Sequence, residues 1–536
     1  MQHETNQTSA MGKVVDSNYG LELSILGQTS SRSYTRLLYC FPLPVFISHN
    51  DTQSLVHMFR LATDQLIVKW PFLGSKIRLR NPEDPAGPVE LFWTRDENPL
   101  SFDEHRWFST AGVLRFKGVE EWGEKGAPDY SKLASWGVPP SVLKDYELCH
   151  VPHEPSLEGR GGWPVYQITV NFTIGGLMIC ACFANSVIDS YAHGIIFEEF
   201  SKQVRGRRRP VNEMDKSVGQ TQDRNKQIDM AAHAGKNIDW TKESCPEFLP
   251  PKPPLLEEPV GLAGITVSSK SRSSKSRYSK FKTSTVLGRV FSFPIKLLER
   301  RHQGLQKHIS TDTAGRPEVA YQLEDMLVAW VWGSIVRARI RKEPKDTKDF
   351  SKHVPSQLAV SMNARSRLGI PDGEKYLRNA ILYNCVELKS SDMLKEESTG
   401  PRMKLHRATR TLHDKTQSFD YEAIRIRLGY MSAIRKQPGS LEYQVDSADE
   451  NDVIVDWLLA PGRVTYFGSF DIGGRIIELG YPEFVRELPG SDAPGRCAIL
   501  PRHPDPKAPF EVYIQLDEDG MERMTTYLRV DGVHCI

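Results

Sequence analysis

The sequence predicts an α/β or α+β protein with mixed sheets, and three observations in one stretch lead to that class. An apolar run, Leu177–Phe183, follows Gly175-Gly176 and is typical of a strand buried on both faces. Before it, Val165–Phe172 alternates apolar and polar residues, which predicts a half-buried strand paired with the first in a hairpin. After it, the sequence becomes helix-like, with one helical face formed by His193, Ile196, Phe197, Phe200 and Val204.

The end of the second strand is the candidate functional site. Asn185 and Asp189 stand four positions apart where the strand pattern gives way to the helix pattern. Polar side chains at such junctions are common places for binding and catalysis. Both residues are therefore candidate catalytic residues.

Composition bounds the possible functions. The 536 residues are 39% hydrophobic and 25% charged with a net charge of +2, as expected for a globular protein of two or more domains, and no polyanionic partner such as nucleic acid is indicated. No apolar run approaches the roughly 20 residues of a membrane span, and the first thirty residues hold no signal-peptide core. Cys180 and Cys182 are the only close cysteine pair and lack a second pair at zinc spacing, so we expect buried free thiols, no metal and a cytoplasmic location.

The first half of the chain begins with a polar segment, residues 1–18, that we expect to be frayed, and continues as an N-terminal lobe over 19–204. A helix with Leu55, Val56, Phe59 and Leu66 on one side is expected to start from an N-cap at Asp51 or Thr52. Residues 81–162 are rich in proline, glycine and charge and predict loops and short strands. The other expected elements are a strand at Arg36–Phe46 before this helix, a turn at Trp70–Gly74 after it, and a strand at Lys76–Arg80 after the turn.

Residues 205–285 differ in composition from both flanks. They contain RGRRRP, PPKPPLLEEP and SSKSRSSKSRYSKFK and few large apolar residues, so they cannot bury enough surface to offset the entropy of ordering. A basic, Ser-rich tract can bind RNA or anionic lipid or be phosphorylated, but its single Tyr and single Phe offer no platform for stacking bases. We predict a flexible crossover linker, with a C-terminal lobe over 286–536.

The second half again mixes strands and helices. A strong helix is predicted over Tyr321–Arg339, two more within Pro401–Arg435 and a closing one over Glu518–Leu528. The predicted strands are Arg289–Phe293, Gln357–Met362, Ala380–Leu388, Asp452–Leu459, Val464–Phe470 and Phe510–Leu516.

Seven short motifs, in order, carry a family resemblance. They are WPFLG at Trp70–Gly74, Ala184–Ser190, the helix from Asp325 to Arg339, Asn363–Arg367, YLRNAI at Tyr376–Ile381, Asp471-Ile472-Gly473, and LGYPE at Leu479–Glu483. In that order they are similar to YPFLAG, HHxxxDG, DxLxA with its downstream Trp and Ala-Arg, DxRxR, YFGNA, DFGWG and LGKPE. The chain thus resembles the fungal BAHD-type acyl-CoA-dependent acyltransferases, relatives of chloramphenicol acetyltransferase.

The resemblance implies two chloramphenicol acetyltransferase-like lobes with a tunnel between them. Acyl-CoA, a co-substrate and not a bound cofactor, would enter one mouth, and the hydroxyl or amine of a small-molecule acceptor the other. The motif aspartate, here Asp189, would pair with an arginine, here Arg365, to support the motif loop. Asp471 and Gly473 would be structural. A cytoplasmic monomer acting in fungal secondary metabolism is implied.

Asn185 is where this chain departs from the family, whose motif has its catalytic histidine there. Ala184 and Ser190 also differ from the family's residues. An amide cannot take up a proton near neutral pH, whereas imidazole titrates there. Three functions remain open: acyl transfer with another group as base, a cyclisation or elimination driven by orientation, and binding without catalysis. His193 is expected to be a core residue on a helix face, and nothing in the sequence places His150 or His153 at the site.

Overall fold

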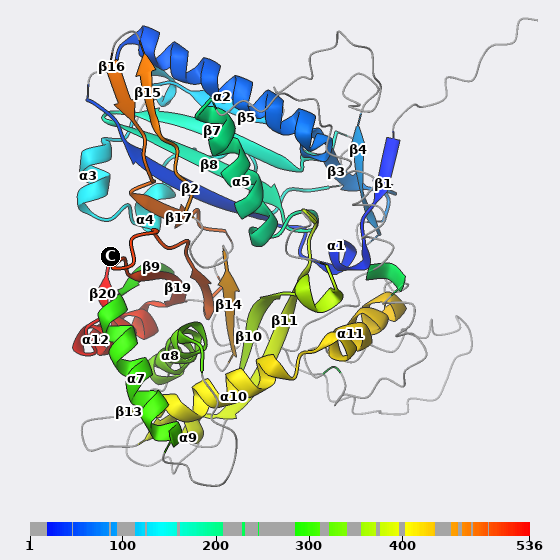
Figure 1. The fold of residues 1–536 in the computed structure, drawn as a ribbon, viewed down its shortest axis with the longest axis vertical. Coiled ribbons are helices and arrows are strands. Elements are labelled where there is room, and N and C mark those ends of the chain that lie inside the picture. The colour runs from blue at the N-terminus through cyan, green and yellow to red at the C-terminus, as the bar shows by residue number, and fades with distance from the viewer. Residues whose placement is uncertain are drawn as a thin grey trace, which may run out of the picture.

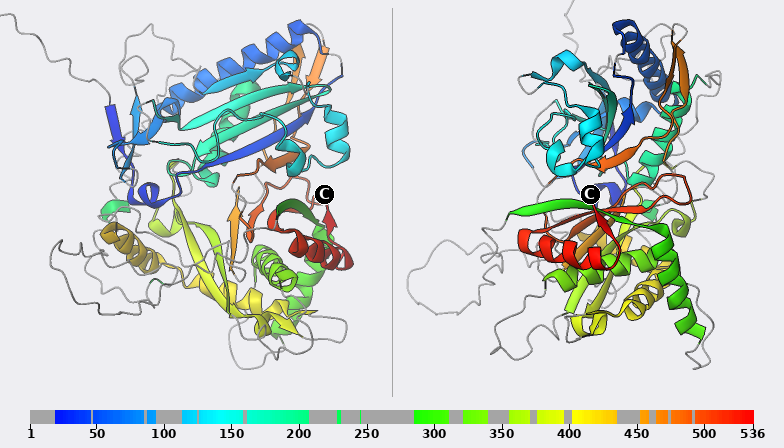
Figure 2. Two further views of the ribbon diagram at one scale, coloured as in Figure 1. Left: turned by 180° about the vertical axis from the view of Figure 1, so that it is seen from behind. Right: turned by 90° about the vertical axis from the view of Figure 1, so that its left-hand side faces the viewer.

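The computed structural model has two lobes stacked one on the other, each built on its own sheet (Figures 1 and 2). It describes residues 19–45, 47–84, 87–93, 113–123, 126–157, 161–206, 228–230, 245, 285–310, 321–339, 355–370, 376–395, 402–434, 452–458, 464–472, 475–490 and 493–536. The mixed α/β class and the two-lobe architecture expected from the sequence are confirmed.

The N-terminal lobe is organised around a five-stranded sheet in the order β17-β2-β8-β7-β5. β7 and β8 form the predicted antiparallel hairpin, with Tyr166 opposite Phe183. α2 and α5 lie on one face of the sheet, with Phe59 stacked on Phe200 between them. The elements are β2 Tyr34–Pro42, α2 His49–Lys69, β5 Leu114–Lys117, β7 Tyr166–Thr173, β8 Gly176–Ala184, α5 Ser190–Val204 and β17 Phe484–Glu487.

The prediction that β7 is only half buried is wrong, because all eight of its residues are buried. The second face of the sheet is covered by α3 (Tyr130–Ser135), α4 (Pro140–Leu143) and the loop after them. Leu133, Leu143 and Leu148 from this segment share a core cluster with Cys180. Gln167, Thr169 and Asn171 therefore lie in a polar layer inside the protein and not at its surface.

A smaller sheet of four strands, β1-β4-β3-β6, completes the N-terminal lobe. Its strands are β1 Tyr19–Glu22, β3 Lys76–Leu79, β4 Val89–Trp93 and β6 Trp163–Pro164, with α1 Ile25–Thr29 and the short 3-10 helices Pro71–Gly74 and Val119–Glu121 nearby. The expected N-cap at Asp51 or Thr52 is wrong. Ser48 caps α2, and Asp51 is the third residue of a capping box whose carboxylate accepts from the Ser48 N–H.

The C-terminal lobe has a seven-stranded sheet in the order β11-β10-β14-β18-β19-β9-β20. α8 packs on it through two fully buried indoles, and the Trp332 N–H donates to Ser356 at 2.8 Å. Its strands are β9 Val286–Phe293, β10 Pro355–Asn363, β11 Ile381–Lys389, β14 Asp452–Trp457, β18 Arg496–Ile499, β19 Phe510–Asp517 and β20 His534–Cys535. Its helices are α7 Ile295–Ser310, α8 Leu323–Arg339, α9 Ser390–Met393, α10 Leu405–Gln417, α11 Tyr421–Ile434 and α12 Glu518–Val530, with a 3-10 turn at Ser366–Leu368 and a small β12–β13 pair at Leu394–Lys395 and Arg402–Met403.

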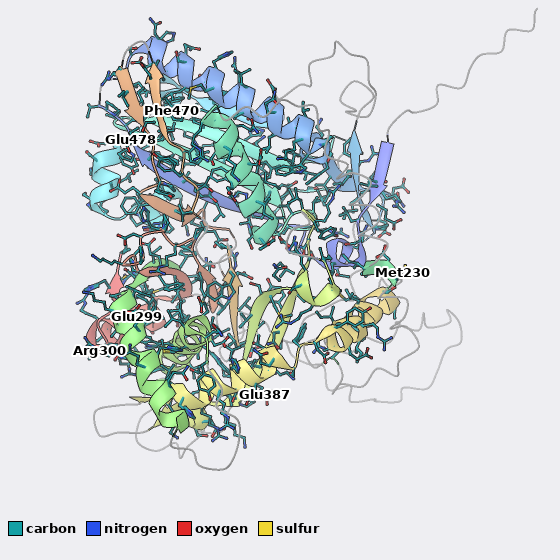
Figure 3. All side chains as sticks on the ribbon, in the orientation of Figure 1. Met230, Glu299, Arg300, Glu387, Phe470 and Glu478 are labelled. Atoms are coloured by element: carbon teal, nitrogen blue, oxygen red, sulfur yellow. The ribbon has the colours of Figure 1, made fainter. Side chains whose placement is uncertain are left out.

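Within the described residues, the chain returns to the N-terminal lobe after entering the second. β17 pairs antiparallel with β2, opposite Leu37–Cys40, so it extends the first lobe's sheet. Just before it, β15 (Ser469–Ile472) and β16 (Arg475–Glu478) form a hairpin beside the first turn of α2, where Arg475 lies 3.9 Å from Asp51. Phe470 and Glu478 mark this hairpin in Figure 3. The predicted strand Val464–Phe470 is wrong over Val464–Gly468, which is irregular and is joined to Leu479 and Gly480 by backbone hydrogen bonds at Phe467 and Gly468.

Residues 1–18 and most of the predicted linker, 205–285, lie outside the described residues. At two described points within 205–285 the chain packs against the fold. Ile228 and Cys245 are buried in a cluster with Ile25 and Leu26 of α1 and Leu428 of α11, while neighbouring Met230 is exposed beside α11 (Figure 3).

Cys180 and Cys182 are buried free thiols, as expected. Within the described part of the chain, no helix is long and apolar enough to cross a membrane.

Candidate functional site

The strand-to-helix junction of the N-terminal lobe forms a compact turn at the boundary with the second lobe. β8 ends at Ala184, whose carbonyl accepts from the N–H groups of both Val187 and Ile188. α5 then begins, with Asp189 as its N-cap accepting from the Ala192 N–H at 2.8 Å. This turn over residues 185–189, which we call the motif loop, holds both predicted catalytic residues. Asp189 favours a helix start here, because an N-cap carboxylate accepts a hydrogen bond from a helix amide that otherwise has no partner.

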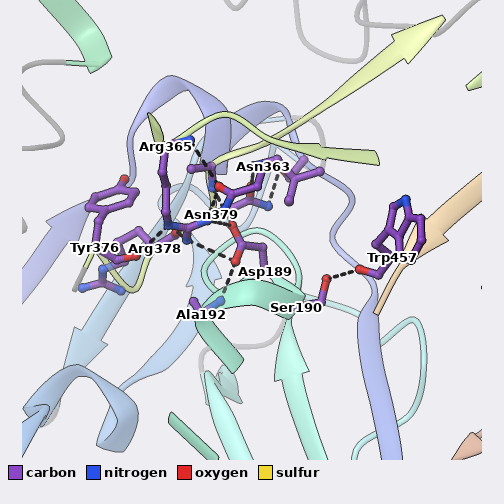
Figure 4. Close-up of polar contacts among 12 residues, drawn as sticks. Asp189, Ser190, Ala192, Asn363, Arg365, Tyr376, Arg378, Asn379 and Trp457 are labelled. Carbon is purple, nitrogen blue, oxygen red and sulfur yellow. Dashed lines mark hydrogen bonds and ion pairs between the residues drawn. The ribbon is translucent and has the colours of Figure 1, made fainter. Parts of the chain in front are cut away.

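Asp189 and Arg365 form the ion pair that the family resemblance implied (Figure 4). Arg365 Nη1 lies 2.8 Å from Asp189 Oδ2, and the two side chains are 4% and 2% exposed. Arg365 Nη2 also donates to Asp189 Oδ1 at 3.1 Å. The Ala380 N–H donates to the other carboxylate oxygen at 2.8 Å, so every direction around the carboxylate is occupied. The Asp189 carboxylate is therefore fully engaged in contacts that hold the loop.

The YLRNAI segment joins the motif loop to the second lobe. Arg365 donates to the carbonyls of Tyr376 and Arg378 at 2.9 and 2.6 Å, which fixes this segment over the loop. Asn379 then donates to the Asn185 carbonyl at 2.5 Å, and its own N–H donates to Val187 O at 2.8 Å. YLRNAI stands out in the sequence as a motif, but nothing there indicates that its asparagine, Asn379, binds the loop backbone.

The WPFLG turn contacts the YLRNAI segment as well. The Arg378 guanidinium carbon lies 4.1 Å from the centroid of the Phe72 ring, a cation–π contact. Burial lowers the pKa of Arg378 to about 10. Four motifs that are distant in sequence thus lie together: WPFLG, the motif loop, Asn363–Arg367 and YLRNAI.

Asn185 is partly exposed, and both ends of its amide are held by hydroxyls around the start of β2. Thr35 Oγ1 donates to Asn185 Oδ1 at 2.7 Å, and Asn185 Nδ2 donates to Ser33 Oγ at 3.0 Å. Asn185 N–H also donates to the Ser33 carbonyl at 3.1 Å. The amide orientation is therefore fixed, with Oδ1 accepting from Thr35 and one Nδ2 hydrogen donated to Ser33. Sequence reasoning missed Ser33 and Thr35, since no motif marks them.

Two further contacts fix the loop between the lobes. Ser190, which replaces the family's glycine, donates from its hydroxyl to the Trp457 carbonyl of β14 at 2.7 Å (Figure 4). On the other side, α1 approaches so closely that a Cβ on Gly27 would lie 2.6 Å from the Ser186 carbonyl oxygen. Glycine is therefore required at position 27 for α1 to lie on the motif loop.

The remaining predicted residues lie elsewhere. Asp471 is exposed on β15, in the hairpin beside α2, and the polar partners of Asn185 and Asp189 come from other segments. Gly473 lies outside the described residues. No group of His, Cys, Asp and Glu suited to a metal occurs among the residues that the structure describes.

His193 is a core residue, as the sequence predicted. It is fully buried, with Nε2 2.8 Å from the Tyr39 hydroxyl and Nδ1 3.1 Å from the Tyr166 hydroxyl. Both ring nitrogens are therefore occupied by contacts within the core. Burial lowers the pKa of His193 to about 3, so the imidazole is neutral in the folded protein.

The buried His193 predicts an acid-dependent loss of stability. Its pKa is about 3 when folded and about 6.5 when unfolded, so only the unfolded chain binds this proton between those values. Stability is fully present above pH 6.5 and falls by about 1.4 kcal/mol per pH unit as the pH drops toward 3. Denaturant unfolding of wild type and His193→Phe from pH 7 to 4 measures this. The variant should be less stable than wild type at pH 7, because the Tyr39 and Tyr166 hydroxyls lose their hydrogen-bond partner. Its stability should then fall less steeply with decreasing pH. Parallel curves of stability against pH for the two proteins would contradict the prediction.

Comparison with known proteins agrees with the resemblance, although no family profile matches the chain. The chain is 22% identical to the O-acetyltransferase ptmV of Penicillium ochrochloron, covering 94% of each chain. It is 25% identical to the trichothecene 3-O-acetyltransferase of Saccharomyces cerevisiae, over 69% of this chain and 68% of the relative. Among solved structures, F. sporotrichioides TRI101 in complex with coenzyme A and T-2 matches with a TM-score of 0.68 and 15% identity, over 96% of this chain and 100% of that one.

Proposed function

We propose that this chain, a homologue of the fungal O-acetyltransferases with their BAHD-type fold, transfers an acyl group from a CoA thioester to the hydroxyl of a small molecule. The observation that carries the proposal is the motif loop, in which the Asp189–Arg365 pair and the YLRNAI segment hold Asn185 at the boundary between the lobes. An amine remains the alternative acceptor. The setting we propose is fungal secondary metabolism.

Asn185 in this proposal orients reactants and stabilises charge; it does not take a proton. An amide nitrogen carries two hydrogens, and Ser33 accepts only one of them. The second can donate to the thioester carbonyl as negative charge develops on its oxygen, the kind of preorganised interaction that contributes strongly to acyl transfer. Thr35 holds the amide in this orientation by donating to Oδ1, which removes the alternative flipped arrangement.

We further propose a monomer in the cytoplasm. All eight cysteines are free, which is usual for a reducing compartment.

Calorimetric titration with acetyl-CoA and with desulfo-CoA as a non-reacting control tests the proposal, followed by mass-spectrometric assay of acetyl transfer to a panel of hydroxylated terpenoids and phenols. Binding with a mass gain of one acetyl group on an acceptor supports acyl transfer. The second candidate is an orientation-driven cyclisation or elimination, favoured by an amide that is held at both ends and cannot act as base. Product formation of unchanged mass, without any CoA binding, would favour it. Ligand binding without turnover would indicate a binding protein.

A further inference from the structure

We propose that Cys149 is an oxidation site, whose thiol reacts with a hydroperoxide and is then closed into a disulfide by the buried thiol of Cys180. Three free cysteines form this site: Cys149 from the loop after α4, and Cys180 and Cys182 from β8. None of them takes part in the proposed acyl transfer.

Cys180 and Cys182 project from one face of β8. They are two residues apart on the strand, so their side chains lie on the same side of the sheet. α3, α4 and the loop after them cover that side, and the two residues are 0% and 1% exposed. A reagent in solution therefore cannot reach either of these thiols first.

The loop over residues 148–153 begins on this same face. The Asn171 amide of β7 donates to the Leu148 carbonyl at 3.1 Å and, with its other contact, to the Met178 carbonyl of β8 at 3.1 Å. Leu148 is thus fixed over the β7–β8 pair, two residues before Cys180 along β8.

The far end of the loop is fixed to β2, on the other side of β8. The His153 carbonyl accepts from the Tyr34 N–H at 2.7 Å, and Tyr34 lies opposite Ala184 of β8. Between these two ends the loop crosses the sheet face that carries the two thiols. Cys149, the residue after Leu148, packs against both core clusters, of which one contains Cys180 and the other Cys182.

The Cys149 sulfur is in direct contact with both thiols of β8. The side chains of Cys180 and Cys182 are within hydrogen-bonding reach of it, and the Val151 carbonyl oxygen lies 3.4 Å away. Cys149 is the partly exposed member of the group. It is therefore the thiol that a small oxidant reaches, with a second thiol already beside it.

Charge around the cluster favours a thiolate at Cys149. Hydrogen bonds from Cys180 and from Cys182 lower the pKa of Cys149 well below its usual range, burial opposes them, and Arg36 lowers it further. The pKa of Cys180 is raised, chiefly by its hydrogen bond to Cys149, and that of Cys182 chiefly by burial. The cluster thus holds one thiolate between two thiols.

Arg36 supplies the positive charge. It lies directly opposite Cys182 in the β2–β8 register. Its Nη2 donates to the Pro489 carbonyl, but its buried Nε has no hydrogen-bond partner among the described residues. A thiolate at Cys149 therefore compensates a buried cation. A partly exposed thiolate with a cation and a resolving thiol nearby is the arrangement typical of cysteines that react with peroxide.

The reaction balances in two steps with hydrogen peroxide as oxidant. The Cys149 thiolate attacks one peroxide oxygen and the O–O bond breaks, which leaves a sulfenic acid and, after protonation of the departing hydroxide, one water. The Cys180 sulfur then bonds to the Cys149 sulfur as the S–O bond breaks, and the hydroxide leaves with the Cys180 proton as a second water. Two thiols lose two electrons and the peroxide gains them.

Hydrogen peroxide treatment of the full-length protein at pH 7 tests the proposal. Free thiols are blocked with N-ethylmaleimide before unfolding, and a non-reducing tryptic digest is analysed by mass spectrometry. We expect the peptides of residues 145–160 and 161–202 to be linked through Cys149 and Cys180, and dithiothreitol to separate them. Alkylation of Cys149 by iodoacetamide should change little from pH 7 to 8.5, whereas an ordinary thiol reacts about 10-fold faster at the higher pH.

Substitutions assign the two roles. Cys149→Ser should abolish the linkage and leave Cys180 reduced. Cys180→Ala/Cys182→Ala should accumulate the sulfenic acid of Cys149, captured by dimedone. Cys535→Ser, at another partly exposed cysteine, is the matched control and should keep the linkage.

Two results would overturn the proposal. One is a wild-type protein in which peroxide leaves Cys149 reduced or oxidises it without linking it to Cys180. The other is a rate of Cys149 alkylation that rises with pH as steeply as that of an ordinary thiol. Both measurements are made on the wild-type chain, so neither depends on whether a variant folds or on whether acyl transfer is detected.

Discussion

Asp189→Ala should lower the free energy of unfolding by about 3–5 kcal/mol, the cost of leaving one partner of a buried ion pair without the other. The side chains of Asp189 and Arg365 are 2% and 4% exposed, so water cannot replace the lost carboxylate. The substitution also removes the cap of α5 and the acceptor for the Ala380 N–H. Both losses loosen the junction between the lobes, so activity should fall along with stability. Urea unfolding followed by circular dichroism measures the change.

An exposed ion pair on the same helix provides the control. Glu198 and Lys202 lie 2.7 Å apart on α5 with side chains about 40% exposed, and Glu198→Ala should cost no more than about 1 kcal/mol. The double variant Asp189→Ala/Arg365→Met should be more stable than Asp189→Ala, since it removes the stranded charge. If Asp189→Ala is as stable as Glu198→Ala, the buried pair does not hold the loop.

The hairpin and the polar junction that holds Asp189 could be predicted because their signals are local. An apolar run and an alternating run in sequence define β7 and β8, and Asp189 occupies an N-cap position that its own neighbours specify. The partner Arg365, 176 residues away, followed only from the family resemblance. Periodicity alone carries no information about a contact at that separation.

The errors have tertiary causes. The polar residues of β7 predict a solvated face, but α3 and α4 return to cover it and turn Asn171 into an interior residue that donates to Leu148, Thr169 and Met178 carbonyls. A separate omission is α7, since no helix was predicted over Ile295–Ser310. His153 was placed in a loop with no assigned partner, because its interaction with Tyr34 joins segments 119 residues apart.

Asn185→Ala should lower the rate of acyl transfer by about 5- to 160-fold, which corresponds to roughly 1–3 kcal/mol for a hydrogen bond lost at the reacting centre. Stability should change little in comparison, because the amide is partly exposed and Ser33 and Thr35 remain accessible to water. Thr35→Val is the matched variant, since it removes only the hydroxyl that fixes the amide orientation. It should give a smaller fall in kcat. Equal rates for Asn185→Ala and wild type would remove Asn185 from the site.

Asn185→His separates the possible chemistries at the same position. For acyl transfer with another group as base, imidazole at 185 restores the family's arrangement, and the rate should rise about 10-fold with a pH dependence near the imidazole pKa of about 6.5. For a reaction driven by orientation alone, the rate should fall. The Asn185 amide accepts from Thr35 and donates to Ser33 at the same time, and an imidazole cannot reproduce both hydrogen bonds in that geometry. For a binding protein, turnover stays at zero and only ligand affinity changes. The sign of the rate change, measured with and without acetyl-CoA, therefore tests whether the chain kept the family's reaction when it replaced the family's base.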